Sequence, residues 1–206
     1  TPTLSVMLLA AMLILGSIGG FIGQNQGEGG SLTQLLWMYT ISFAAKLPVI
    51  FAFKILRKCN ESRHILITTI VTFAVFVPLA HTVAGFLHVI FVSIGLEANE
   101  PLGHSTLNLF TQETFGLPII ALILLVTIGA ATVEEVMFRG LLFPALASVI
   151  GGRSMWKASI ATSIIFALIH IGPAQPSAIA GLFFLSLGLC YARVKSGSVL
   201  SPILIH

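Results

Sequence analysis

The chain has 206 residues, of which 56% are apolar and only 8% carry a full charge. Soluble domains carry charge on roughly a quarter of their residues, so this composition excludes an ordinary water-soluble globular protein, and its apolar content excludes a disordered chain. The net charge of +3 is small and its basic residues are dispersed, which gives no basic surface for nucleic acid. The composition therefore predicts an all-α, polytopic membrane protein.

Apolar runs of about the 20 residues that a membrane-spanning helix needs follow one another along the chain. They cover residues 4–22, 35–56, 64–96, 117–150, 156–171 and 177–194, and a further run begins at residue 199. Backbone groups in lipid must be satisfied internally, and these runs are too uniformly apolar for alternating barrel strands. We therefore expect residues 1–206 to form a single transmembrane domain, a bundle of about seven helices with the last one truncated.

The loops between these runs alternate in charge. Basic residues occur in the loops 57–63, 151–157 and 193–195, whereas the loops 24–34, 97–115 and 172–176 contain no Lys or Arg. Cytoplasmic loops of membrane proteins are enriched in Lys and Arg, so we expect the amino terminus and the basic loops to be cytoplasmic. The first residue is Thr1 and the last, His206, lies inside an apolar run. This pattern predicts a longer chain at both ends.

Three charged residues fall inside the fourth apolar run. Glu135 and Arg139 are four residues apart, which places them on one face of a helix as an ion pair. Glu134 points about 100° away around the helix and has no partner within this segment. A carboxylate in a low-dielectric site suits a general base or a proton relay. Charges inside a membrane span are functional candidates by default.

Two histidines lie at a depth comparable to that of Glu134. His170 follows Lys157 by 13 residues, or about 20 Å of helix measured from a basic loop. His206 lies eight residues past Ser198, about 12 Å in from the same side. We therefore expect Glu134, His170 and His206 to meet in one polar cavity below the cytoplasmic face.

Lys46 and two further histidines also lie inside apolar runs. Lys46 stands beside Pro48, and it either pairs with a buried carboxylate or extends its charge toward the membrane surface. His81 and His88 are two turns apart on one helix face, with no carboxylate or thiolate nearby at metal-ligand spacing. We interpret both histidines as structural or interfacial.

Three motifs in residues 132–206 resemble a known family. They are Glu134-Glu135 followed three residues later by Arg139, then Phe166 followed three residues later by His170, and a Gly-Ser turn at 197–198 followed by a proline and His206. In this order they resemble the type II CAAX prenyl protease and bacteriocin-processing family, abbreviated CPBP or Abi. The motif-bearing core is expected over residues 132–206.

The resemblance implies an intramembrane endopeptidase. Glu134 would activate a water molecule, His170 would help to hold it, and Glu135 and Arg139 would orient the site. His206 would stabilise the oxyanion together with an Asn or Asp that the family carries four residues later. The reaction so described needs no cofactor. Zn²⁺ held by Glu134, His170 and His206 is the less favoured alternative.

The same resemblance sets the expected partners, which are membrane lipids and a peptide or prenylated-protein substrate, and no nucleic acid. One alternative is a non-catalytic subunit or assembly factor that binds other subunits of a membrane complex. Another is a proton-coupled transporter, which would also use buried Glu and His. The transporter ranks last, because no paired discontinuous helices are evident in the sequence.

Overall fold

A computed structural model describes residues 2–24, 32–52, 62–97, 116–150 and 155–206 of the chain. Every regular element within these ranges is a helix, which confirms the expected all-α fold. The elements are α1 (Pro2–Gln24), α2 (Leu32–Ala52), α3 (Ser62–Ser93), α5 (Leu117–Leu124), η2 (Leu125–Ala130), α6 (Ala131–Glu135), η3 (Val136–Leu142), α7 (Phe143–Ile150), α8 (Met155–Leu168), α9 (Pro176–Ser196) and α10 (Leu200–Ile205).

The predicted apolar runs correspond to these helices. The run 117–150 is one continuous helix that passes from α5 through η2, α6 and η3 to α7, where η2 and η3 are π-helical. Within the described residues, four helices are long and apolar enough to cross a membrane, Thr3–Ile22, His64–Ser93, Leu117–Ile150 and Pro176–Ser196. The chain is therefore an integral, multi-pass membrane protein. The expected orientation stays a prediction, and the loop residues 57 and 153 on which it depends lie outside the described ranges.

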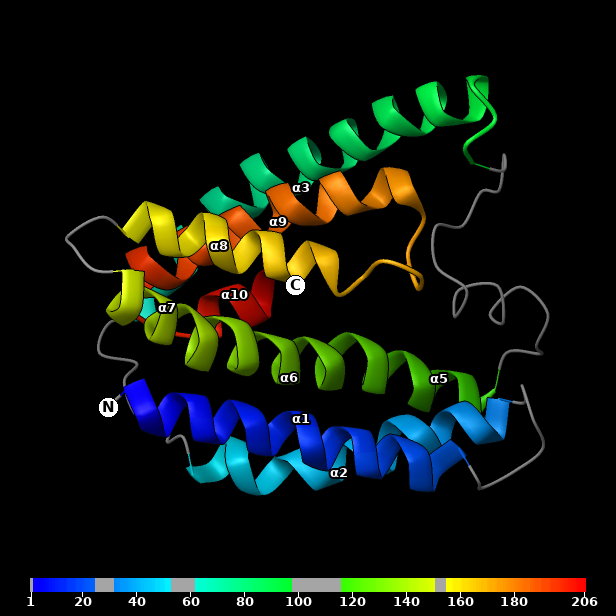
Figure 1. Ribbon diagram of the computed structural model, residues 1–206, viewed down its shortest axis with the longest axis vertical. Coiled ribbons are helices and arrows are strands. Elements are labelled where there is room, and N and C mark those ends of the chain that lie inside the picture. Colours follow the sequence, from blue (N-terminus) through cyan, green and yellow to red (C-terminus); the bar gives the residue numbers. More distant parts are fainter. Residues whose placement is uncertain (1, 25–31, 53–61, 98–115, 151–154) are drawn as a thin grey trace.

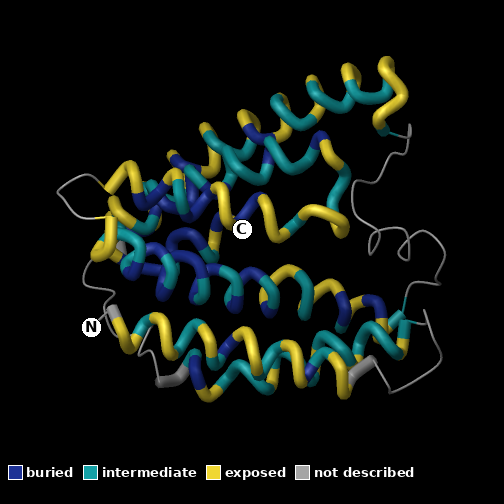
Figure 2. The backbone as a smooth tube through the Cα atoms, in the orientation of Figure 1, coloured by how far each residue is buried: buried dark blue, intermediate teal, exposed yellow. Residues whose placement is uncertain are grey.

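The helices form three layers (Figure 1). One layer pairs α1 with α2, the long helix α5–α7 crosses the middle, and α3, α8 and α9 form the third, with α10 between the middle and third layers. Buried residues gather where α6, η3, α7, α8, α9 and α10 meet, toward one end of the bundle (Figure 2). The charged motif residues lie in this densely packed end.

The contact between α3 and α9 depends on a small residue. A Cβ atom added at Gly181 would lie 2.8 Å from the carbonyl oxygen of Ala80 and 3.0 Å from the Cβ of Ala84. Small residues let helix backbones approach closely, which drives helix association in membranes, where the hydrophobic effect contributes little. Gly181 thus fixes how near α9 lies to α3.

A carboxylate joins the C-terminal end of α3 to the start of α9. Glu97 accepts hydrogen bonds from the backbone N–H of Ser177 at 3.2 Å, from Ser177 Oγ at 2.9 Å and from His88 Nδ1 at 3.0 Å. Burial by itself raises the pKa of the Glu97 carboxyl, but these hydrogen bonds outweigh it and hold the pKa below its usual value. The carboxylate also lies at a helix N-terminus, where negative charge is favoured. His88 therefore has a carboxylate partner that sequence spacing did not indicate.

We expect Glu97→Gln to lower the free energy of unfolding at neutral pH by about 1–2 kcal/mol, because it weakens a charged helix cap. Since the folded pKa is depressed, this stabilisation is present above the unfolded pKa of about 4 and is lost as the pH falls further. Thermal unfolding of both proteins in detergent, from pH 7 down to pH 3, tests this. The difference between them should shrink in acid. Identical melting temperatures at every pH would show that Glu97 does not join the helices.

Candidate active site

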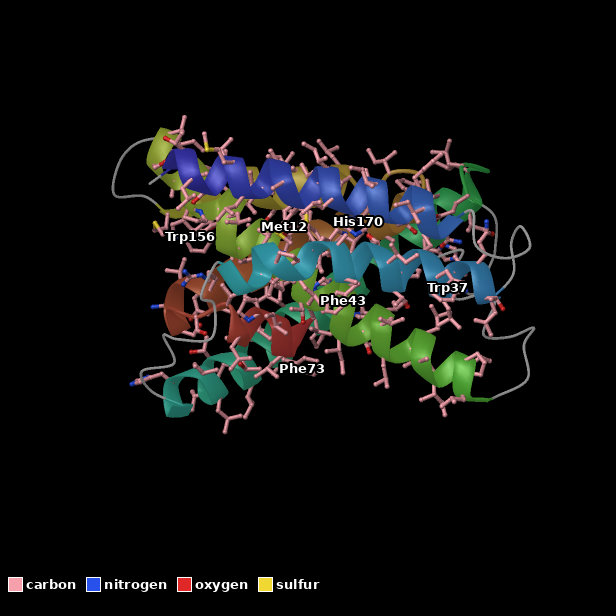
Figure 3. The ribbon with its side chains drawn as sticks, turned by 90° about the horizontal axis from the view of Figure 1, so that it is seen from below. Met12, Trp37, Phe43, Phe73, Trp156 and His170 are labelled. Atoms are coloured by element: carbon pink, nitrogen blue, oxygen red, sulfur yellow. The ribbon has the colours of Figure 1, made fainter. Side chains whose placement is uncertain are left out.

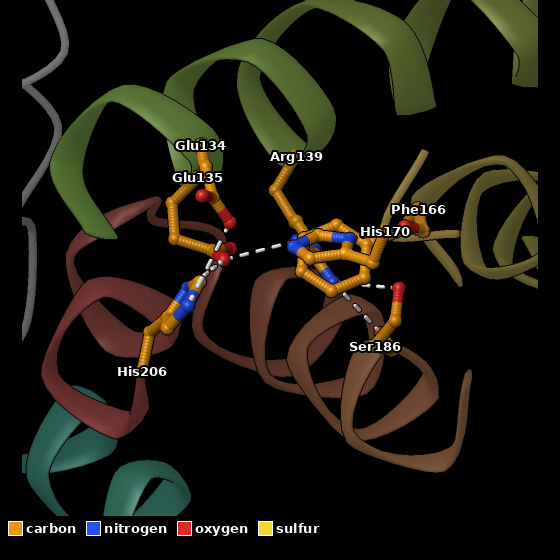
Figure 4. Close-up of polar contacts among 7 residues, drawn as sticks. All are labelled: Glu134, Glu135, Arg139, Phe166, His170, Ser186 and His206. Atoms are coloured by element: carbon orange, nitrogen blue, oxygen red, sulfur yellow. Dashed lines mark hydrogen bonds and ion pairs between the residues drawn. The ribbon is translucent and has the colours of Figure 1, made fainter. Parts of the chain in front are cut away.

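The motif residues come together from four separate elements (Figure 4). Glu134 and Glu135 are the last two residues of α6, and Arg139 follows in η3. His206 is at the end of α10, and His170 lies in the turn after α8. The site is therefore built by packing α6 and η3 against three helices from later in the chain.

Glu135 and Arg139 form the ion pair that their spacing predicted. Arg139 Nη1 donates to Glu135 Oε1 at 2.9 Å, and both side chains are 0% exposed. Arg139 Nη2 also donates to Ser186 Oγ at 2.7 Å and to the Ser186 carbonyl oxygen at 3.2 Å. The guanidinium lies over the ring of Phe166, with Cζ 4.7 Å from the ring centroid. This burial places the pair inside the bundle.

His206 contacts both adjacent glutamates. Its Nδ1 lies 2.9 Å from Glu135 Oε1, and because the ionised carboxylate only accepts, Nδ1 carries the donated proton. Its Nε2 lies 3.7 Å from Glu134 Oε2, too far for a direct hydrogen bond. Glu135 therefore fixes the orientation of the imidazole, and Nε2 is the atom that faces Glu134.

The two glutamates differ in accessibility. The side chain of Glu134 is 28% exposed, whereas that of Glu135 is 0% exposed. Glu134 Oε2 is nevertheless buried and makes no hydrogen bond with the described residues. Glu135 bonds Arg139 and His206 through Oε1, and its Oε2 is likewise buried without a hydrogen-bond partner among the described residues. Of the two, Glu134 is the carboxylate that an external molecule can reach.

His170 joins the cluster through Phe166. Its Nδ1 lies 2.7 Å from the carbonyl oxygen of Phe166, which can only accept, so Nδ1 is protonated and Nε2 is left for another partner. The ring of Phe166 lies 4.7 Å from the His170 ring and 6.2 Å from the His206 ring. The four-residue spacing of Phe166 and His170 is thus explained, because one helical turn brings the ring nitrogen to the carbonyl.

The turn between α9 and α10 sets the position of His206. Gly197 has φ of 67°, a left-handed conformation that ends α9 and that residues with a Cβ rarely adopt. Ser201 of α10 then shares a hydrogen bond with Thr69 of α3 at 2.9 Å. The Gly-Ser turn and this contact direct α10 toward α6.

The structure also includes a residue that the sequence analysis did not single out. Ser186 lies in the middle of α9, is fully buried and binds the guanidinium of Arg139. A hydroxyl inside an apolar span is a signal that could have identified it, because such groups hydrogen bond across helices. In the described part of the chain, no three His, Cys, Asp or Glu side chains are arranged to hold a metal ion. The choice between a metal-free site and Zn²⁺ stays a prediction.

Together, the fold and the site define a class: a multi-pass helical membrane protein with a buried, charged cluster of two glutamates, an arginine and a histidine. Residues 116–206 match the family described as Rce1-like type II CAAX prenyl endopeptidases. This match confirms the family resemblance that the motifs indicated. Over residues 116–206 the chain is therefore similar to this family of membrane endopeptidases.

One curated relative matches 91 residues of this chain, as many as the family match covers. It is an uncharacterized 24.3 kDa protein of Escherichia coli, 32% identical over 91 residues, which are 43% of this chain and 40% of the relative. The chain thus matches about two fifths of the length of that relative. No solved structure matches the chain.

Removing Arg139 alone should destabilise the protein strongly. Arg139→Met leaves the buried carboxylate of Glu135 without its cation, and losses of this kind cost roughly 3–5 kcal/mol. We expect little folded protein, or a much lower midpoint of thermal unfolding in detergent. Lys195→Met, which removes an exposed cation at the end of α9, is the matched control and should melt like wild type. Equal melting of Arg139→Met and the control would contradict a structural role for the pair.

Proposed function

We propose that the protein is an intramembrane endopeptidase in which Glu134 activates a water molecule for attack on a peptide bond near the cytoplasmic face. The observation that carries this proposal is the contrast between the two adjacent glutamates. Each has one buried oxygen without a hydrogen-bond partner among the described residues, but Glu135 is fully buried in an ion pair with Arg139, whereas Glu134 is partly exposed. One glutamate can hold the site together while the other stays available for chemistry.

The proposed hydrolysis uses the chain's own residues and water. Glu134 accepts a proton from the water as its oxygen attacks the carbonyl carbon of the substrate peptide bond. The resulting tetrahedral oxyanion collapses, the C–N bond breaks, and the proton held by Glu134 passes to the leaving amine nitrogen. The products are a new carboxylate and a new amine, so one water molecule is consumed for each bond cleaved.

The two histidines supply donors and acceptors for these steps. His206 Nε2 faces Glu134, and a proton on that nitrogen would stabilise the developing oxyanion. Glu135 keeps the ring in place through Nδ1, so the donor needs no reorganisation when the oxyanion forms. His170 is held at Nδ1 by a backbone carbonyl, which leaves Nε2 to accept a hydrogen bond from the attacking water.

The family match suggests the substrate class. Type II CAAX prenyl endopeptidases take their name from C-terminal CAAX motifs, in which the cysteine carries a prenyl group and three residues follow it. A prenylated protein C-terminus is therefore the substrate that we propose, with an unmodified peptide as the comparison. The site lies in the membrane-spanning bundle, where a prenyl chain could partition beside the peptide.

Glu134→Gln tests the proposal, because it keeps the size of the side chain and removes the base. We expect the cleavage rate of a prenylated CAAX peptide to fall by at least about 10²–10⁴-fold, the usual contribution of general-base catalysis. Insertion and thermal stability should barely change, because the pair of Glu135 and Arg139 is intact. Cleavage is measured with purified protein in liposomes, at matched amounts of folded protein.

Glu97→Gln is the matched control, since it makes the same chemical change at a glutamate that bonds His88 and Ser177 and none of the site residues, and it should retain cleavage. Equal cleavage by wild type and Glu134→Gln would remove Glu134 from the mechanism. No cleavage by wild type of any prenylated or unmodified peptide, with unchanged stability in the Gln variant, is the result expected of a non-catalytic scaffold.

A further inference from the structure

Lys46 is a cation in α2 that the proposed mechanism does not use. Its side chain is half-buried, and among the described residues it forms no ion pair. A charge inside a membrane bundle is costly without a counter-ion, so such residues mark sites that receive ions or charged ligands.

The neighbours of Lys46 on α2 pack against the helix that carries the proposed base. Three residues before it, Phe43 lies with its ring 3.5 Å from the position that a Cβ at Gly129 would occupy. Three residues after it, Val49 packs in one apolar cluster with Val133. Residues spaced by three share a helix face, so Lys46 lies between two contacts with this helix. Figure 3 shows Phe43 near the point where α2 crosses it.

The side chain of Lys46 is held in place by packing against α1. Val133, which packs with Val49, directly precedes Glu134, and no ion pair joins Lys46 to Glu134. The Lys46 side chain crosses Gly16 of α1, where an added Cβ would overlap Cε and lie 2.8 Å from Nζ. One turn earlier on α2, Ser42 Oγ donates to the Gly16 carbonyl oxygen at 3.2 Å. Gly16 therefore forms a notch that holds the lysine side chain.

We propose that Lys46 binds the C-terminal carboxylate of the peptide substrate. This inference rests on the proposed function, because a CAAX-type substrate ends three residues after the prenylated cysteine. Three extended residues span at most about 10 Å, so the carboxylate should bind at a short distance from the water-activating glutamate and not at it. A cation that is near Glu134 but outside ion-pair distance meets this requirement. The ammonium and the carboxylate would each replace lost hydration with a charged hydrogen bond.

The test compares two prenylated CAAX peptides that differ only at the C-terminus, one a free acid and the other an amide. We expect wild type to cleave the acid with a kcat/KM roughly 10- to 100-fold higher, the usual value of a hydrogen bond to a charged group. Lys46→Met should lose this preference through a higher KM for the acid, with little change for the amide. Lys46→Arg should restore part of it. Lys195→Met is the control and should keep the full preference.

Two results would overturn the inference. One is wild type that cleaves acid and amide equally well. The other is Lys46→Met that loses activity equally on both peptides, which would assign Lys46 to Glu134 or to folding. Failure of the proposed function is a different result, because wild type would then cleave neither peptide.

Binding measurements keep the inference testable without turnover. The Glu134→Gln protein is titrated with fluorescent acid and amide peptides, with and without the additional Lys46→Met change. We expect the acid to bind roughly 10-fold more tightly than the amide, and only when Lys46 is present. Equal affinities in the presence of Lys46 would contradict the proposal. If Lys46→Met does not accumulate, Lys46→Gln replaces it in both assays.

Discussion

The buried ion pair of Glu135 and Arg139 is the interaction on which the packed end of this bundle depends. Neither group has contact with solvent, so each must find its partners inside the protein. Arg139 is bonded by Ser186 of α9, and Glu135 by His206 at the end of α10. Docking of these two helices onto the middle helix is therefore coupled to completing one charged network.

Under the proposed mechanism, this coupling lets two neighbouring glutamates serve structure and chemistry separately. Glu135 makes the hydrogen bonds that connect Arg139 and His206. Oε2 of Glu134, one residue earlier, makes no hydrogen bond with the described residues. The 100° turn between consecutive helix residues separates the two tasks, because it directs one carboxylate into the core and the other toward an accessible edge.

Much of this arrangement could be predicted from the sequence, and the remainder depends on contacts between helices. Spacing within one helix predicted the pair of Glu135 and Arg139, and apolar runs predicted the helices. Depth arguments brought His206 to the glutamates but could not tell which one it bonds, since both lie at nearly the same depth. Ser186 and the contact between His88 and Glu97 were missed, because no local spacing reports which faces of two helices meet.

The π-helical segments η2 and η3 have a consequence for how the middle helix can change. A π turn holds about one residue more than an α turn, and each such residue shifts the α-helical register beyond it by about 100°. The α-helical segments before η2, between η2 and η3, and after η3 thus follow three different α-helical registers within one continuous helix. Losing a single residue from η3 would be absorbed by return to α-helical register, so α7 would keep the same side toward α8 and the helix would stay unbroken.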